Sequence, residues 1–408
     1  MQAYLIDIFD SSRAKGELVK VGVSATGRLI MEDKLKFVVI KLKNINSTAL
    51  NILKQEALRI GAELANHRDV ITGRIPKSDS LLFGTPVQVR FIIQKIKNQE
   101  FGLKGLAKEL DEILSFSDKT RKKSNPLSIK AGGKKLVFDG NTLIMGVLNI
   151  TPDSFSDGGK YLDKKAAEKR GREIEEEGAH ILDIGGESTR PGAALVDAKE
   201  EIKRICPVME RLARTLKIPI SVDTRKPEVA LAAINSGASI INDASGLSFD
   251  PDGMAKVLLK TKSPYILAHS RGKTPDTMQK NLVPYDDIFY EIIEYFQDKI
   301  KFLAAMGYRR ENIILDPGFG FAKSFEDNYN LLIGTPSFKS LGSPVLAGVS
   351  RKSFINKLTG KTEEVLLSGD IAAAVVLKLN RVDMVRVHDV RATASAFTVI
   401  DNIYRKGE

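Results

Sequence analysis

The sequence is poor in the residues that build metal cages and disulfide frameworks. It has one cysteine, Cys206, and four histidines among 408 residues. A single cysteine excludes a disulfide framework and any zinc or iron–sulfur site held by several thiolates. The small number of histidines argues against a histidine-rich metal cage.

Long apolar runs are also absent. No stretch approaches 18 apolar residues, so we expect no membrane span. The first nine residues alternate apolar and polar side chains and lack a basic segment, which is not typical of a signal peptide. We therefore expect a cytoplasmic protein.

The composition that remains is that of an ordinary globular protein, with 43% apolar and 28% charged residues. The length suggests two or three domains, or one barrel of about 250 residues with a smaller unit. The net charge of +11 is uneven: residues 1–126 hold 22 basic against 14 acidic residues. Since the basic residues are scattered with few aromatics between them, we predict a solvated surface and no nucleic-acid partner.

Residues 115–135 are polar, charged and interrupted by Pro126 and two glycines, which is typical of a linker. We place the domain boundary near Asn125, giving a small α/β domain over 1–125 and a larger domain over 126–408. In the first domain we predict strands over 35–42 and 87–93, and helices over 46–65, with Ser47 or Thr48 as its cap, and 103–114. No nucleotide loop, metal spacing or catalytic dyad is visible there.

Short apolar runs alternate with longer amphipathic stretches in the second domain. The eight runs are residues 143–148, 180–184, 219–222, 239–241, 265–268, 312–315, 344–347 and 383–387. Such alternation predicts parallel strands joined by right-handed helical crossovers. Eight units over about 270 residues predict a closed (β/α)₈ (TIM) barrel.

Polar and glycine-rich residues follow every run, at the barrel end where active sites lie. Carboxylates at Asp223 and Asp316, with the amide of Asn242, can pair with the edge of a flat heterocycle. Lys352 can meet a ring carbonyl or nitrogen, and Arg386 offers a planar face for stacking. A second set suits an anion such as diphosphate with magnesium: Asn149, Arg190, His388 and the amides of residues 185–186.

Structural interpretations compete with these for several residues. Asp223 can cap the helix that starts near Lys226, and Asp316 can be a turn residue. Asp183 is open between a scaffold role and a ligand role. The three histidines outside the last loop are expected to be structural: His67, His180 and His269.

Residues 143–408 resemble the dihydropteroate synthase family of pterin-binding barrels. The resemblance lies in four strings in order along the chain: MGVLNITPDSFSDGG (145–159), DIGGESTRPG (183–192), LDPGFGF (315–321) and GVSRKS (348–353). At residue 268 an alanine stands where the family often has methionine. The segment before the barrel resembles an extension of some members, without an assignable chemistry.

The resemblance implies the condensation of 6-hydroxymethyl-7,8-dihydropterin diphosphate with para-aminobenzoate to 7,8-dihydropteroate and diphosphate. The pterin ring would be held by Asp223, Asn242, Asp316, Lys352 and Arg386. Diphosphate would be bound by Asn149, Arg190, Arg386 and His388, with Asn149 also holding Mg²⁺. Para-aminobenzoate would be contacted by Thr189, Phe321, Lys352, Ser353 and Phe155.

A dissociative substitution at the pterin methylene carbon is the mechanism we expect, since the ring stabilises positive charge there. Besides Lys352 and Arg386, its catalytic residues would be Arg190 and His388 at the leaving anion and Asp157 at the cation, the last on a mobile first loop with Phe155. The family is usually homodimeric. The alternative is a pterin-binding methyltransferase that uses methyltetrahydrofolate, which would not require the strings at 188–192 and 350–353.

Overall fold

The computed structural model describes residues 3, 4, 6, 11–119, 126–151, 160–187, 195–271, 283–359 and 362–405. The chain divides into two compact units, Met1–Phe116 with Asp401–Glu408, and Ser117–Ile400. Residues 120–125, where the sequence analysis places the domain boundary, lie outside the described residues, so that boundary stays a prediction. No described helix combines the length and the apolar character needed to cross a lipid bilayer.

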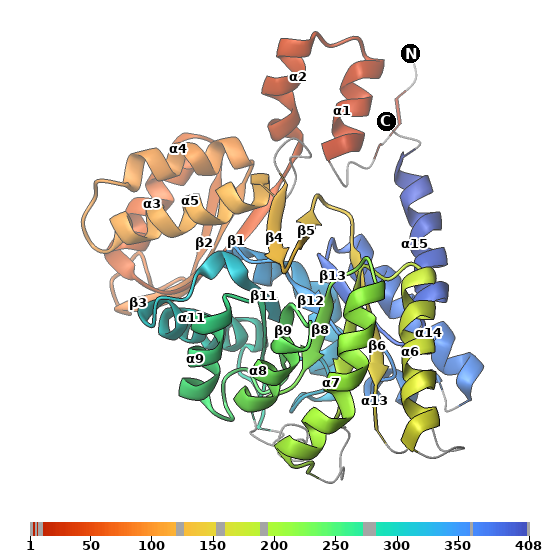
Figure 1. Ribbon diagram of the computed structural model, residues 1–408. Coiled ribbons are helices and arrows are strands. Elements are labelled where there is room, and N and C mark those ends of the chain that lie inside the picture. Colours follow the sequence, from red (N-terminus) through yellow and green to blue (C-terminus); the bar gives the residue numbers. More distant parts are fainter. Residues whose placement is uncertain are drawn as a thin grey trace. The chain divides into compact units, whose positions relative to one another are not determined.

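The first unit is an α/β structure with an antiparallel three-stranded sheet of order β1-β3-β2 (Figure 1). Its buried core includes Leu50, Leu53, Leu82 and Ile92, which come from the sheet and from α3 and α4. The elements of the unit are α1 (Ser11–Lys20), α2 (Ala25–Met31), η1 (Glu32–Leu35), β1 (Val38–Asn46), α3 (Ser47–Arg59), β2 (Glu63–Asn66), β3 (Lys77–Gly84), α4 (Pro86–Ile96) and α5 (Leu103–Lys119).

One predicted strand of this unit is wrong. Residues 87–93 lie in helix α4, although valine and isoleucine favour strands. The helix is started by a capping box, in which Thr85 and Gln88 bond reciprocally, and by Pro86 in the first turn. The cap of α3 is also corrected, since Asn46 accepts from Thr48 N–H while Ser47 donates to the Ile75 carbonyl.

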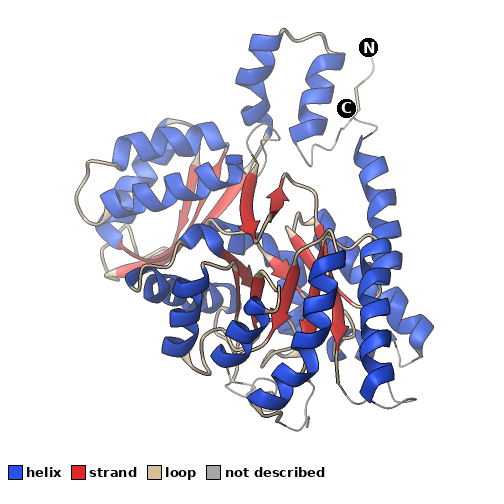
Figure 2. Ribbon diagram, in the orientation of Figure 1, coloured by secondary structure: helices blue, strands red, loops and turns tan. Residues whose placement is uncertain are grey.

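Eight parallel strands form the barrel of the second unit, in the order β11-β10-β9-β8-β7-β6-β13-β12. A parallel bridge between Leu315 and Val345 joins the two ends of this order, so the ring closes. Figure 2 shows the strands enclosed by helices. The predicted (β/α)₈ barrel and all eight of its strands are confirmed.

Each strand of the barrel is followed by at least one helix along the chain. They are β6 (Leu143–Asn149), α6 (Lys160–Glu176), β7 (Ile181–Gly185), α7 (Ala198–Thr215), β8 (Ile220–Asp223), α8 (Pro227–Asn235), β9 (Ile240–Asp243), α9 (Pro251–Thr261), β10 (Tyr265–Ala268), α11 (Ile288–Ala305), η3 (Arg310–Asn312), β11 (Ile313–Asp316), α12 (Phe325–Gly334), η4 (Thr335–Leu341), β12 (Leu346–Ala347), α13 (Ser353–Thr359), α14 (Glu363–Leu379), β13 (Met384–Val387) and α15 (Val390–Arg405).

A β-hairpin of strands β4 (Leu127–Ala131) and β5 (Lys134–Phe138) closes the amino-terminal end of the barrel. Its buried side chains Ile129, Leu136 and Phe138 pack against the first residues of the barrel strands, among them Ile181 and Ile240. The linker predicted over 115–135 is therefore wrong from residue 127 on, where this hairpin begins. Since one mouth is filled by apolar side chains, a polar site belongs at the carboxyl ends of the strands.

Candidate active site

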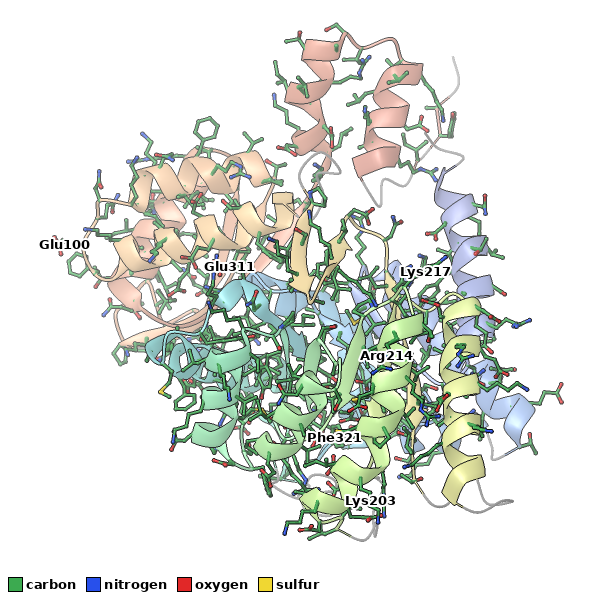
Figure 3. The ribbon with its side chains drawn as sticks, in the orientation of Figure 1. Glu100, Lys203, Arg214, Lys217, Glu311 and Phe321 are labelled. Atoms are coloured by element: carbon green, nitrogen blue, oxygen red, sulfur yellow. The ribbon has the colours of Figure 1, made fainter. Side chains whose placement is uncertain are left out.

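A pocket opens at the carboxyl-terminal mouth of the barrel, opposite the β4–β5 hairpin. Phe321, which lines it, is labelled in Figure 3. Seven of the predicted site residues line this pocket: Asp223, Asn242, Asp316, Phe321, Lys352, Arg386 and His388. Ala244, Phe319, Gly348 and Ser350 complete the lining. Side chains from five separate strand ends thus meet at one place.

The position of these residues at the ends of their strands explains this convergence. Asp223 is the last residue of β8 and pairs with Asn242 of β9, while Asp316 is the last residue of β11. Parallel strands in a barrel end at the same mouth, so side chains at equivalent positions lie at one level. Asp223 does not cap α8, because the cap residue is Lys226 and it makes no side-chain cap bond.

Arg386 is held between two carboxylates. Its Nε donates to Oδ2 of Asp183 at 2.6 Å, and one terminal nitrogen donates to Oδ2 of Asp223 at 2.7 Å. The same oxygen of Asp183 accepts from the Asn242 amide at 3.1 Å. Burial works against the charged guanidinium, but the two carboxylates outweigh it and raise the pKa of Arg386. Arg386 is therefore a fixed cation in the pocket wall.

Asp223, the second carboxylate that contacts Arg386, has a raised pKa. Burial raises the pKa of Asp223 to about 7, and the negative charge of Asp183 adds to the rise, while Arg386 opposes it. A ligand that donates hydrogen bonds to Asp223 replaces lost water contacts and favours the ionised form. The carboxylate is thus prepared to accept from ring N–H and amino groups.

Lys352 and Asp316 form the other side of the pocket. Burial, with the nearby charge of Arg386, lowers the pKa of Lys352 to about 8, and Asp316 opposes this. Burial also raises the pKa of Asp316. Asp316 accepts from Gly318 N–H at 2.8 Å, so the predicted turn role and a place in the pocket both hold. The ammonium of Lys352 lies 4.4 Å from the centre of the Phe321 ring.

His388 and Asn149 lie at the edge of this cluster. The Nδ1 atom of His388 lies 3.1 Å from Ser350 Oγ. Asn149 ends β6 opposite Gly185, and a Cβ built on Gly185 would lie 3.5 Å from both Asn149 Oδ1 and Asp223 Cβ. Asn149 does not itself line the pocket, and its amide oxygen lies beside Gly185, which pairs with Asp223 in the strand register.

The remaining predicted residues are placed differently. Ser353 starts α13, is exposed and does not line the pocket. Four predicted site residues lie outside the described residues: Phe155, Asp157, Thr189 and Arg190.

Comparison with known proteins decides the family. A family model described as "Pterin binding enzyme" matches residues 145–388. Dihydropteroate synthase of Synechocystis is 45% identical over 267 residues, which cover 65% of this chain and 91% of that protein. The chain belongs to the dihydropteroate synthase family. Its activity is that of a dihydropteroate synthase, a transferase of folate biosynthesis, and the methyltransferase alternative is set aside.

Solved structures agree with this family. Two structures of Xanthomonas albilineans dihydropteroate synthase, with 4-aminobenzoic acid and with 7,8-dihydropteroate, are 40% and 38% identical, with TM-scores of 0.64 and 0.61. Each match covers 68% of this chain and 98% of the Xanthomonas chain. A probable bifunctional folylpolyglutamate synthase/dihydropteroate synthase of Halobacterium salinarum matches 97% of this chain at 34% identity, and the match spans 46% of that protein. That relative is similar over the first unit as well.

Within this synthase the other histidines are structural, as predicted. His180 accepts the Ile144 N–H on Nδ1 at the start of β7. Nδ1 of buried His269 lies 3.0 Å from the Lys323 ammonium, and His67 accepts from Asp69 N–H in an exposed turn. Cys206 is buried in α7, and burial raises the pKa of its thiol, so it is a poor nucleophile.

Sequence reasoning missed several supporting residues of the synthase. Ser350 lies in a quoted string and yet received no role, and Asp370 was not considered. Glu187, which accepts from Arg225 and forms an ion pair with Lys226, was likewise not predicted to have a role. The usable signal for such residues is a charge at a buried helix or strand position, because a buried charge needs a partner.

Proposed function

We propose that this mouth of the barrel condenses 6-hydroxymethyl-7,8-dihydropterin diphosphate with para-aminobenzoate. The observation that carries the proposal is the convergence of Asp223, Asn242, Asp316 and Lys352 in one pocket. The two carboxylates accept hydrogen bonds from the amino and ring N–H groups of a pterin, and Lys352 donates to its carbonyl or ring nitrogen. Arg386 stacks on the ring and contributes positive charge toward the diphosphate.

Diphosphate binds, in this proposal, beside the pterin pocket. His388 and Arg386 line the pocket, and Arg190 is the third group that we assign to the diphosphate. Charge-assisted bonds from these groups strengthen as negative charge develops on the leaving diphosphate, so they stabilise the transition state more than the ground state.

Mg²⁺ fits this end of the site. Asn149 presents a neutral oxygen beside Asp223 across Gly185, and its side chain takes no hydrogen-bond partner among the described residues. The described residues contain no group of three or more histidine, cysteine or acidic side chains that forms an all-protein cage. One amide oxygen with phosphate oxygens and water is a donor set that Mg²⁺ accepts. When bound, the ion supplies positive charge that neutralises the diphosphate.

Para-aminobenzoate occupies, in this proposal, the side of the pocket at Phe321 and Lys352. Thr189, Ser353 and Phe155 are assigned to it as further contacts. This placement is supported by the ammonium of Lys352, which lies over the Phe321 ring. Lys352 offers a charge for the carboxylate of the substrate, and Phe321 offers an apolar surface for its ring. The same Lys352 thus contacts both substrates.

The reaction proposed is a dissociative substitution. The bond between the methylene carbon and the diphosphate oxygen breaks first, and the pterin ring shares the positive charge left on carbon. The amine nitrogen of para-aminobenzoate then forms the new C–N bond and loses one proton. Asp157 stabilises the cation by its negative charge, while Arg190 and His388 hold the departing anion.

The test supplies the full chain with pterin diphosphate, para-aminobenzoate and magnesium, and measures dihydropteroate and released diphosphate. Omission of either organic substrate abolishes product, and Asp223→Asn lowers the rate at least about 100-fold. Asp252→Asn is the matched control, because Asp252 is an exposed carboxylate on α9. Wild-type protein without product, or equal rates for both variants, would contradict the proposal.

We propose further that the synthase forms a homodimer through α12 and α14. Asn380 donates to the Leu332 carbonyl at 2.8 Å, which brings the ends of these helices together. Ile333 and Leu379 there are 72% and 44% exposed, an apolar patch that a partner copy would cover. Ile333→Asp should give a monomer in light scattering, whereas Leu58→Asp on α3 should not. A monomeric wild type would contradict this.

The cytoplasm is the location we propose. The lone thiol, buried at Cys206, is compatible with a reducing compartment. Cell fractionation should recover the synthase with cytoplasmic markers, and recovery from the medium or the membrane pellet would contradict the proposal.

A further inference from the structure

A carboxylate behind the pocket holds the loop that carries Ser350 and Lys352. Asp370 is a buried residue of α14. Its Oδ2 accepts from Ser350 Oγ at 2.8 Å, and its two oxygens accept from the Arg351 N–H at 3.0 and 2.8 Å. Arg351 has a φ of 58°, a left-handed conformation that disfavours residues with a side chain. Asp370 therefore stabilises a strained turn directly before Lys352.

Ser350 connects this carboxylate to His388. The hydroxyl oxygen lies 3.1 Å from His388 Nδ1 and also accepts from the His388 backbone N–H at 3.3 Å. A serine hydroxyl has one proton, and an ionised carboxylate can only accept, so that proton points to Asp370. Ser350 Oγ must then accept from the ring, and a neutral His388 carries its proton on Nδ1.

The contacts of Asp370 are those of an ionised carboxylate, since both of its oxygens accept from the Arg351 N–H. Burial raises the pKa of this carboxyl group, and the bonds from Ser350 and from the Arg351 N–H oppose that rise. The other charges near His388 are the Arg351–Asp389 pair, 3.4 Å apart, and Lys352 and Arg386 in the shared pocket lining. Of the two acids, Asp370 alone bonds to Ser350 among the described residues.

We propose that Asp370 is a positioning residue which, through Ser350, fixes His388 in the Nδ1–H tautomer. The proton that turns the ring into a cation then binds at Nε2. A ring held in one orientation and one tautomer meets the leaving diphosphate without reorganisation, which is the advantage of a preorganised group. The inference rests on the proposed role of His388 at the diphosphate.

The tautomer can be measured independently of turnover. In the full chain labelled with ¹⁵N-histidine, ring nitrogen shifts distinguish a protonated from an unprotonated nitrogen. His180 is an internal reference, since its Nδ1 accepts the Ile144 N–H at 3.1 Å and its neutral ring carries the proton on Nε2. The inference predicts the opposite pattern for neutral His388. A proton on Nε2 of neutral His388 in the wild type would overturn it.

Variants separate positioning from general support of the fold. Ser350→Ala and Asp370→Asn should move neutral His388 toward the Nε2–H tautomer, shift the pH profile and lower kcat about 10-fold, with His180 unchanged. Asp389→Asn, which removes a neighbouring charge without touching Ser350, should leave the tautomer as in the wild type. Should Asp370→Asn not fold, Ser350→Ala decides alone.

Two outcomes distinguish this inference from the proposed function. Loss of activity in Ser350→Ala with an unchanged tautomer and pH profile would overturn the positioning role. A wild type that shows the predicted tautomer but forms no dihydropteroate would leave the positioning of His388 by Asp370 and Ser350 in place. It would overturn the proposed function instead.

Discussion

The Nε atom of Arg386 donates to Oδ2 of Asp183 at 2.6 Å, so a fully buried carboxylate orients the guanidinium in the pocket wall. Oδ1 of Asp183 is buried and has no hydrogen-bond partner among the described residues. A buried ion pair of this kind is costly to break, because each charge left alone lacks water. The geometry favours the scaffold role of Asp183 over the ligand role that the sequence left open.

Replacement of this buried carboxylate should impair catalysis. Asp183→Asn keeps the shape but removes the charge facing Arg386, and we expect kcat/KM to fall roughly 30-fold, equivalent to about 2 kcal/mol. Steady-state kinetics with the pterin diphosphate as varied substrate measure it. Asp252→Asn on the exposed face of α9 is the control, and equal kinetics for the two variants would count against the scaffold role.

The pH dependence of kcat/KM should be bell-shaped. Pterin binding uses ionised Asp223, whose pKa is about 7, so the rate rises with pH through that value. It also uses protonated Lys352, whose pKa is about 8, so the rate falls as pH rises further. In Asp183→Asn the acid limb should move to lower pH, because the charge of Asp183 raises the pKa of Asp223. A flat profile from pH 6 to 9 would refute both assignments.

Removal of the proposed anion contact should reduce turnover strongly. Arg190→Ala is expected to lower kcat by about two to three decades, like the loss of one oxyanion contact. Arg214→Ala is the matched control, since Arg214 is exposed near the end of α7 (Figure 3). Arg190→Ala at the wild-type rate would disprove the assignment.

The turn after β11 should depend on a glycine. Gly318 has a φ of 69°, and an added Cβ would lie 2.1 Å from the His269 carbonyl oxygen. Gly318→Ala should therefore lower the free energy of unfolding by about 2 kcal/mol or more, measured by urea denaturation. Gly133→Ala, where no atom lies within 4 Å of the added Cβ, should stay within about 0.5 kcal/mol of the wild type, and equal losses would contradict the account.

The barrel and its polar mouth could be predicted because each strand is short, apolar and followed by polar residues. Asp223, Asn242, Asp316 and Arg386 all lie in the last two residues of their strands, and the strands of a parallel barrel end at the same mouth. Helix α4 could not be predicted from its apolar run, since the capping box of Thr85 and Gln88 outweighs the strand preference of valine and isoleucine.

The partners of the supporting residues could not be predicted either, for a different physical reason, although a scaffold role for Asp183 was one of two predicted alternatives. Asp370 bonds to Ser350 across 20 positions of the chain, and Asp183 bonds to Arg386 across 203. Such pairs depend on the packing of helices and strands around the closed barrel. No spacing along the sequence encodes that packing, so these carboxylates were visible only as charges without an obvious partner.

Asp223, Asn242, Asp316 and Lys352 line one pocket at the mouth of the barrel, and we propose that the pterin ring binds among them. A crystal structure of the full chain with bound 7,8-dihydropteroate is the decisive experiment. We predict the ring amino and N–H groups within hydrogen-bond distance of the two carboxylates, and the ring carbonyl or a ring nitrogen within that distance of Lys352. A product molecule bound elsewhere, with these four side chains left without contact to it, would contradict the account.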